Sequence, residues 1–181
     1  MALSHAIMTA LLEDDFTGYE LAKYFDTSMG FFWRASHQQI YQELRKMADK
    51  EWLSARVIEQ QGKPNKVRYS LTAAGKETLD QWILAAAKLQ PAKDDFMIKL
   101  YNVGHCDVTP ILAELNERQK TWEKQLEIYQ RIRDKHYTKP KALPDTQKGI
   151  YLTLMVGIGQ MEFYLQWCKE ARVLLGTVKP L

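Results

Sequence analysis

The chain has 181 residues, of which 46% are hydrophobic and 26% are charged, and these are ordinary values for a globular protein. This length allows one domain or two small ones, and the composition excludes disordered, collagen-like and disulfide-stapled classes of protein. The net charge is only +3, but residues 1–33 carry −4, whereas residues 34–76 carry nine Lys or Arg against four acids, a net +5. Such a basic segment favours a surface that faces a polyanion; a solvated surface is the alternative.

Cysteine use and hydropathy bear on the cellular compartment. Cys106 and Cys168 lie far apart in the sequence and belong to no CxxC or Cys/His pattern, so we expect free thiols in a reducing compartment. The most apolar window, residues 150–167, contains Gln160 and Glu162, which makes it a poor membrane span. No signal-peptide pattern is visible. We therefore expect a soluble cytoplasmic protein with no membrane partner.

The first fifty residues predict three short helices. Apolar residues recur at helical spacing over residues 3–11. A capping box, in which an N-cap Ser or Thr is followed three residues later by Glu or Gln, opens a second helix at Thr17 and Glu20. Another capping box, at Ser36 and Gln39, opens a third helix. The apolar face of this third helix carries Ile40, Leu44, Met47 and Ala48.

The hydrophobic period then changes from that of a helix to that of a strand. Apolar residues alternate with polar or smaller ones over residues 53–57 and again over residues 67–71, and turn-forming residues 61–65 separate the two runs. Two such runs around a Gly/Pro turn predict a β-hairpin. Thr72 then caps a fourth helix. The order helix, helix, helix, hairpin, helix is that of a winged helix-turn-helix, and we assign it to residues 1–90.

Residues 91–181 contain no further strand pattern and are predicted to be helical. A short helix around residues 96–103 precedes a long one, for which Thr109 is the predicted N-cap and Pro110 the first residue. The linker 139–144 separates this helix from a second long one, capped by Asp145 or Thr146. The predicted fold class is therefore mostly α with a small β-hairpin.

The two long helices have heptad-like apolar seams. Their seam residues are Leu112, Leu115, Trp122, Leu126 and Tyr129 in the first helix, and Tyr151, Leu154, Ile158, Met161 and Leu165 in the second. An intramolecular hairpin is one arrangement, but a single helical pair buries little surface. We predict instead that these residues complete their core against another copy of the chain, so that residues 91–181 form a dimerisation domain.

The third helix is the predicted recognition helix, the element that enters the major groove in a helix-turn-helix. Gln pairs with adenine, and Arg pairs with guanine or phosphate. Gln39 is ambiguous because the capping box can occupy its side chain. The candidate DNA contacts are Ser36, His37, Gln38, Gln39, Tyr41, Gln42 and Arg45 on this helix, and Lys63, Lys66 and Arg68 on the hairpin. An ordinary polar helix face and a solvated turn are the alternatives.

Signals for catalysis and for metal binding are weak. The four histidines share no metal-ligand spacing, and the sequence lacks GxGxxG, Walker and GxSxG motifs. We therefore expect neither an enzyme nor a protein with a cofactor or a metal. The aromatic run Phe31, Phe32 and Trp33 either lines an effector pocket or packs in the core, and packing is the interpretation that we favour.

Three segments resemble the PadR family of bacterial transcriptional regulators. They are TGYEL at residues 17–21, FWRASHQQIYQEL at residues 32–44, and GKPNKVRYSLT at residues 62–72, followed by Gly75. The long-helix half is similar to the AphA-like subgroup of virulence-gene activators. Tyr41 and Leu44 match the recognition-helix Tyr and Leu of the family, and Lys63, Lys66 and Arg68 match its basic wing.

The resemblance implies a homodimer that binds a partly palindromic operator in double-stranded DNA. In some relatives a small aromatic compound is the effector. The alternative is a winged-helix module that binds another protein and no DNA. The +5 segment favours the regulator, because a protein-binding module has no need of it. The sequence does not indicate the operator, the regulated genes, the sign of regulation or the effector.

Overall fold

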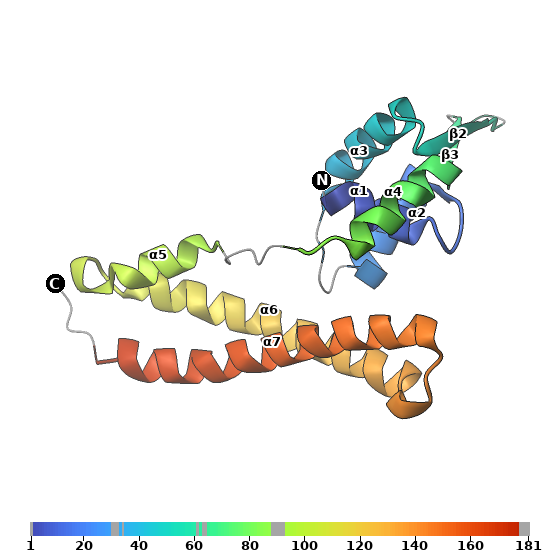
Figure 1. Ribbon diagram of the computed structural model, residues 1–181. Helices are drawn as coiled ribbons and strands as arrows, with labels where there is room; N and C mark the ends of the chain where they lie inside the picture. The colour runs from blue at the N-terminus through green and yellow to red at the C-terminus, as the bar shows by residue number, and fades with distance from the viewer. Residues whose placement is uncertain are drawn as a thin grey trace. The chain divides into compact units, whose positions relative to one another are not determined.

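The computed structural model describes residues 2–29, 33, 35–60, 62, 65–87 and 93–177. The chain divides into two compact units, Met1–Leu89 and Gln90–Leu181. In its described residues the first unit combines helices with a small sheet, whereas the second is helical (Figure 1). The mostly α fold with a small β-sheet confirms the predicted fold class.

The first unit begins with α1 (Ala2–Ala10), β1 (Phe16–Thr17) and α2 (Gly18–Tyr24), and α2 runs into the wider π-type turn η1 (Phe25–Met29). The predicted recognition helix corresponds to α3 (His37–Asp49). Both predicted capping boxes are present. The backbone N–H of Thr17 donates to Glu20 Oε2 over 2.8 Å, and that of Ser36 donates to Gln39 Oε1 over 2.8 Å. The boxes fix the first turn of α2 and of α3 because they satisfy backbone donors that have no partner inside the helix.

The predicted hairpin is the antiparallel pair β2 (Leu53–Ile58) and β3 (Lys66–Leu71), in register from Leu53 opposite Leu71 to Ile58 opposite Lys66. The sequence analysis missed the third strand, β1, which pairs with the other edge of β3. A two-residue strand is too short to show alternation, so only its partner reveals it. After the sheet comes α4 (Ala73–Leu84), and the hydroxyl of Thr72 accepts a hydrogen bond from the N–H of Gly75, as an N-cap does.

One hydrophobic core joins the helices and the sheet of the first unit. The buried face of α3 consists of Ile40, Leu44 and Met47, all fully buried, whereas Ala48 is half-buried. Trp33 is half-buried and packs against this core, in agreement with the packing interpretation. Phe31 and Phe32 lie outside the described residues. The core holds α3 so that its polar face points away from the unit.

The second unit contains α5 (Asp95–Tyr101), η2 (Val103–His105), α6 (Thr109–His136), η3 (Pro140–Ala142) and α7 (Asp145–Leu175). The helices α6 and α7 lie side by side in opposite directions (Figure 1). Two predicted caps are wrong. Thr109 is the first residue of α6, and its N–H donates to the Asp107 carboxylate over 2.9 Å, which supplies the acceptor instead. Pro144 precedes α7, which has no side-chain cap.

The predicted seam residues lie within this single helical pair. Four of them, Leu115, Tyr129, Leu154 and Ile158, are buried in one chain, and the other six, Leu112, Trp122, Leu126, Tyr151, Met161 and Leu165, are half-buried. The intramolecular hairpin is therefore present, and the four buried residues belong to the core of one protomer. The apolar side chains that α7 exposes are different ones: Ile150, Leu152, Val156, Phe163, Val173 and Leu174.

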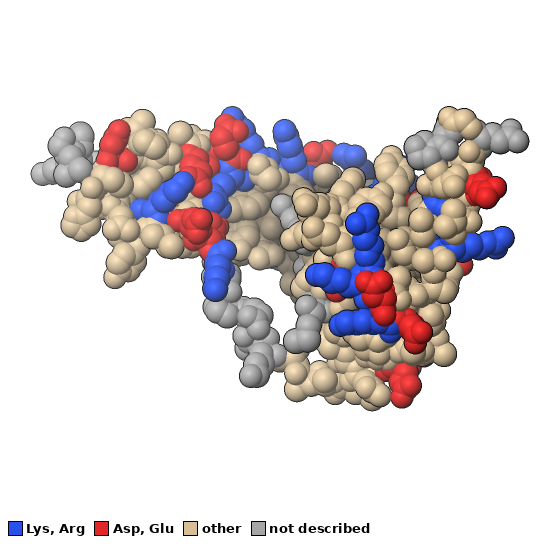
Figure 2. All heavy atoms as spheres, turned by 90° about the horizontal axis from the view of Figure 1, so that it is seen from above, with Lys and Arg blue, Asp and Glu red and all other residues tan. Residues whose placement is uncertain are grey.

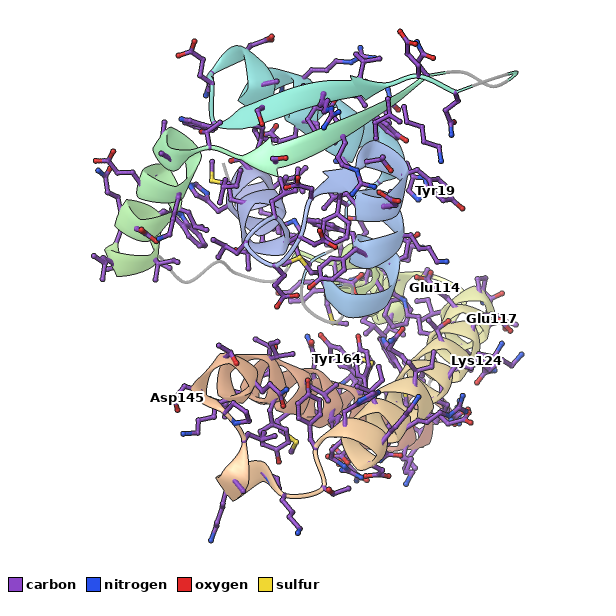
Figure 3. The ribbon with its side chains drawn as sticks, turned by 90° about the vertical axis from the view of Figure 1, so that its right-hand side faces the viewer. Tyr19, Glu114, Glu117, Lys124, Asp145 and Tyr164 are labelled. Carbon is purple, nitrogen blue, oxygen red and sulfur yellow. The ribbon has the colours of Figure 1, made fainter. Side chains whose placement is uncertain are left out.

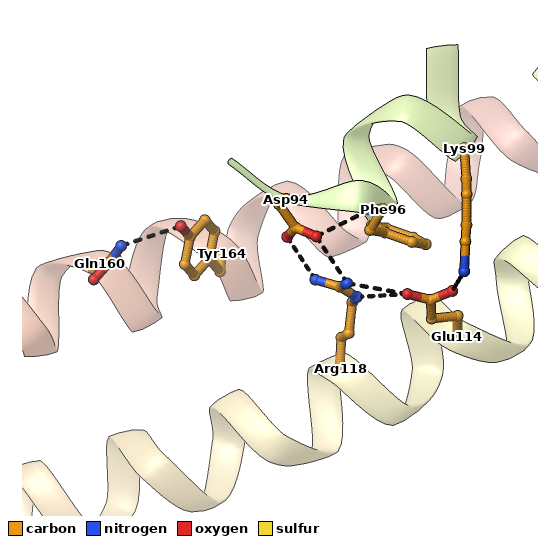
Figure 4. A network of polar contacts seen from close by, with 7 residues as sticks. All are labelled: Asp94, Phe96, Lys99, Glu114, Arg118, Gln160 and Tyr164. Carbon is orange, nitrogen blue, oxygen red and sulfur yellow. Dashed lines mark hydrogen bonds and ion pairs between the residues drawn. The ribbon is translucent and has the colours of Figure 1, made fainter. Parts of the chain in front are cut away.

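A polar cluster fastens α5 to α6 (Figure 4). Arg118 of α6 donates two hydrogen bonds to the carboxylate of Asp94, over 2.7 and 2.9 Å, and its guanidinium lies 4.4 Å from the ring centroid of Phe96. Glu114 accepts from both Arg118 and Lys99. The hydrogen bonds from Arg118 lower the pKa of Asp94, and the N–H of Phe96 adds to this effect.

Candidate nucleic-acid interface

The seven candidate residues on the recognition helix are all exposed, at or near the N-terminal end of α3. Ser36 Oγ and Gln39 Oε1 are occupied by the capping box, as the sequence allowed for Gln39. In the described part of the chain, Gln38, Gln42 and Arg45 form no hydrogen bond or ion pair. Their polar groups are therefore available to base edges, as an α-helix in the major groove requires.

His37 has a partner outside its own helix. Its Nε2 lies 3.3 Å from Oδ2 of Asp26, a residue of η1, and both side chains are more than half exposed. The contact ties the start of α3 to the preceding helical turn. His37 is thus partly engaged, and it is a weaker candidate for base contact than Gln38.

Tyr41 of α3 lies close to both α2 and β3. A β-carbon at Gly18 would stand 2.3 Å from Cε1 of Tyr41, so the tyrosine ring rests directly against the bare backbone at the start of α2. Burial raises the pKa of Tyr69 in β3, and the charge of Arg45 opposes that rise, so Arg45 also lies near this junction. Tyr41 stays 41% exposed, which leaves part of its ring and hydroxyl on the surface.

On the wing, the two described basic candidates differ in their surroundings. Lys66 is exposed at the start of β3. The guanidinium of Arg68 instead turns toward its own chain: Nη1 donates to the carbonyl of Asp15 over 3.0 Å, and Nη2 lies 3.7 Å from Oε2 of Glu20. Lys63 lies outside the described residues. Lys66 is therefore available to phosphate, whereas Arg68 is held by the protein.

The sequence analysis missed two exposed residues beside these candidates. Arg56 of β2 lies directly opposite Arg68, is exposed, and has no hydrogen bond or ion pair within the described residues. Strand alternation was the available signal, because it places the side chains of Ser54 and Arg56 on one face. Tyr19, 66% exposed, projects outward from α2 (Figure 3), and no sequence signal marked it.

The surface charge of the described residues is mixed on the face that Figure 2 shows. On the face shown in Figure 2, Lys and Arg side chains are interspersed with Asp and Glu. Glu20 is one such acid close to the wing: its hydrogen bond from the N–H of Thr17 lowers its pKa, and the charges of Arg68 and Lys66 add to that effect. Arg45, Arg56 and Lys66 are exposed cations of α3 and the wing that form no hydrogen bond or ion pair within the described residues.

No group of three His, Cys, Asp or Glu side chains in the described residues is placed to hold a metal. None of the helices described here combines the length and the apolar character that a bilayer span requires. The chemistry of this surface is that of hydrogen bonding and charge, and its main elements are α3 and the β2–β3 wing.

Comparison with known proteins agrees with this arrangement. Residues 7–81 match the PadR-like family of transcriptional regulators, and residues 92–176 match the C-terminal domain of the virulence activator alpha family. The chain is 35% identical to the probable transcriptional regulator Rv1176c of Mycobacterium tuberculosis, over 94% of this chain and 95% of that protein.

Two solved structures cover nearly the whole chain. The Vibrio cholerae virulence activator AphA is 32% identical, with a TM-score of 0.79 over 98% of this chain and 99% of AphA. Bacillus subtilis PadR in complex with operator DNA is 27% identical, with a TM-score of 0.78 over 97% of this chain and 99% of that one, and PadR has also been solved with p-coumaric acid. The family is one of regulators and not of enzymes. The chain therefore belongs to the PadR-like family of transcriptional regulators.

Proposed function

We propose that the protein is a homodimer that binds a partly palindromic operator in double-stranded DNA and regulates transcription there. The observation that carries this proposal is the combination of an exposed polar face on α3 with free cations on the adjoining wing. The operator complex of the PadR relative supports it. Because operator DNA lies in the cytoplasm of a bacterial cell, the protein acts in that compartment.

Base reading and backbone positioning fall to different residues. Gln38, Gln42 and Arg45 on the exposed face of α3 read base edges in the major groove, where Gln is suited to adenine and Arg to guanine. Lys66 and Arg56 on the wing contact phosphates, and Lys63, which lies outside the described residues, is a further candidate from the sequence. Phosphate contacts position the protein and set the salt dependence of binding, whereas base contacts carry sequence information.

The homodimer places two copies of α3 on one face of the duplex. Half-sites on one face of B-DNA recur about every 34–36 Å, so one protomer alone reads only half of a palindrome. The apolar side chains that α7 exposes are the surface that we assign to the second copy. They include Val156, 71% exposed, and Phe163, 64% exposed. Two of the half-buried seam residues, Leu112 and Trp122, pack against the core of the second unit.

A small aromatic effector is part of the proposal, because the PadR relative has been solved with p-coumaric acid. Such a ligand shifts operator binding only if it binds the competent and incompetent dimers with different affinities. Tryptophan fluorescence titrated with phenolic acids, together with operator affinity, tests this part. If neither signal changes at millimolar ligand, the effector is not a phenolic acid.

The test of the proposed function is selection of bound fragments from genomic DNA by the purified protein. The expected result is enrichment of a small set of fragments that share an imperfect inverted repeat. Recovery of random fragments at all salt concentrations would contradict sequence-specific regulation.

A further inference from the structure

The segment that leads into α2, residues 15–20, touches both DNA-facing elements. Its Asp15 carbonyl and Glu20 carboxylate face Arg68 of the wing, and its Gly18 supports the ring of Tyr41 on the recognition helix. We propose that this lead-in segment is an alignment element that fixes the spacing between wing and recognition helix, with Arg68 and Gly18 as its positioning residues. The inference rests on the proposed function of DNA binding.

The wing side of this arrangement is a clamp made by one guanidinium. Thr17 pairs with Arg68 where β1 meets β3, so the backbones are already adjacent. The Arg68 side chain then uses two different nitrogens, Nη1 for the Asp15 carbonyl at 3.0 Å and Nη2 toward Glu20 at 3.7 Å. Arg56 on the neighbouring strand lies directly opposite Arg68, and like charges in such a pair repel. The Asp15 carbonyl and the Glu20 carboxylate compensate that repulsion on the other side of β3.

The helix side of the arrangement depends on a missing side chain. A β-carbon at position 18 would stand 2.3 Å from Cε1 and 2.9 Å from Cδ1 of Tyr41, distances that would force the ring to move. Gly18 is itself buried, whereas Tyr41 is 41% exposed, so the tyrosine ring is the group that would have to give way to a β-carbon at position 18. The side chain of Tyr41 therefore takes its direction from the backbone of the lead-in segment.

The contact of Arg68 with residues 15–20 is tested with two charge-conserving variants, Arg68→Lys and, as a control in the second unit, Arg131→Lys. A lysine supplies the positive charge that a phosphate contact needs, but its single ammonium cannot reproduce a clamp made by two separate nitrogens. We expect Arg68→Lys to lower operator affinity about tenfold, as the loss of a charge-assisted hydrogen bond does. Arg131 pairs with Glu127 within α6 and is not one of the DNA-facing residues, so Arg131→Lys should bind within about twofold of the wild-type protein. Equal operator affinities for the two variants would overturn the proposal that the Arg68 side chain holds the wing against residues 15–20.

The contact between Gly18 and the Tyr41 ring is tested by introducing Gly18→Ala into the wild-type protein and into a Tyr41→Ala variant. If Gly18 acts through the Tyr41 ring, Gly18→Ala lowers operator affinity about tenfold in the wild-type protein. In the Tyr41→Ala background the ring is absent, so Gly18→Ala should lower operator affinity less than about twofold. An equal loss of operator affinity in both backgrounds would mean that Gly18 affects only α2, and it would overturn the proposed role of Gly18 in positioning Tyr41. Circular dichroism at the assay temperature verifies that each variant is folded.

A readout without DNA separates this inference from the proposed function. Amides of β3 should exchange hydrogen about tenfold faster in Arg68→Lys than in Arg131→Lys, because the clamp that closes β3 onto β1 is weakened. Unchanged exchange in Arg68→Lys overturns the alignment element whatever the protein binds. Failure of the wild-type protein to prefer any DNA sequence overturns the proposed function, and the exchange rates then still decide the inference.

Discussion

Gly75 in α4 lies so close to the backbone carbonyl of Trp52 that a β-carbon at position 75 would stand 2.2 Å from the carbonyl oxygen. The same β-carbon would meet Cδ1 of Leu71 at 2.8 Å. The hydroxyl of Thr72 accepts from the N–H of Gly75 and lies within donating distance of the carbonyls of Glu51, at 2.7 Å, and Trp52, at 3.0 Å, while the N–H of Thr72 donates to the Trp52 carbonyl. The start of α4 is thereby fastened to the turn between α3 and the wing, and this attachment requires glycine.

Gly75→Ala is therefore expected to destabilise the protein by about 1–3 kcal/mol, the usual cost of overpacking, although alanine is the better helix former. The control is Gly149→Ala in α7, where a β-carbon meets nothing within 4 Å; it should stabilise by about 0.5–1 kcal/mol. Chemical denaturation of both variants measures the difference. A stabilising Gly75→Ala would contradict the close approach.

The fold of the first unit was predictable because its signals are local. The capping boxes at Thr17 and Ser36 lie within four consecutive residues each, and the hairpin shows its period directly. The strand β1 and the engagement of Arg68 were not predictable, since both arise from contacts across about fifty residues of chain. The sequence shows that position 68 carries a cation, but not that Asp15 and Glu20 already hold it.

The same distinction applies to the long helices. Their seams identify which residues are apolar, but the period is the same whether the partner helix belongs to the same chain or to another. The burial of Leu115 and Leu154 within one chain assigns those positions to the intramolecular pair. Val156 and Phe163, two of the exposed apolar residues of α7, lie between seam positions and gave no separate pattern.

The Asp94–Arg118 pair should make the free energy of unfolding depend on pH in the acidic range. The hydrogen bonds from Arg118 keep the pKa of Asp94 below its ordinary value, so the pair stabilises the fold above that ordinary value and loses its effect as the pH falls through the lowered one. Arg118→Ala should lower the free energy of unfolding by about 1–2 kcal/mol at neutral pH. This value lies between the contribution of an exposed ion pair and that of a hydrogen bond to a charged group.

The pH dependence of this pair is measured with Asp94→Asn, which can still accept the hydrogen bond from Phe96 but carries no charge. The stability difference between wild type and Asp94→Asn should be constant near neutral pH and should shrink below about pH 4. Thermal unfolding over this range measures it. A difference that grows with acidity would contradict the assigned direction of the pKa shift.

Assembly is predicted to depend on the exposed face of α7. Static light scattering should show a dimer at micromolar concentration, and Val156→Glu should give a folded monomer, because burying an unpaired carboxylate is costly. Val156→Ala, which introduces no charge, should remain dimeric. A wild-type protein that is monomeric at this concentration, or a dimeric Val156→Glu, would refute the assignment of this face to a second copy.

Reading and positioning residues should differ in their effects on DNA binding. Gln38→Ala or Arg45→Ala should lower the preference for operator over random DNA by about 1–3 kcal/mol if either makes a bidentate base contact. Lys66→Ala or Arg56→Ala should instead weaken binding to all sequences and reduce the salt slope by about one charge per half-site. Equal losses on operator and random DNA for the helix variants would show that these side chains contact phosphate only.

The central claim is that this chain reads DNA sequence through α3. Its most direct measurement is fluorescence anisotropy titration of the wild-type protein with a selected operator and with a scrambled duplex of the same length, each over a series of salt concentrations. We expect the wild-type protein to prefer the operator by a factor of at least about 10³ at physiological salt, and we expect this preference to fall sharply in Arg45→Ala but not in Arg56→Ala. Equal affinity of the wild-type protein for both duplexes would contradict it.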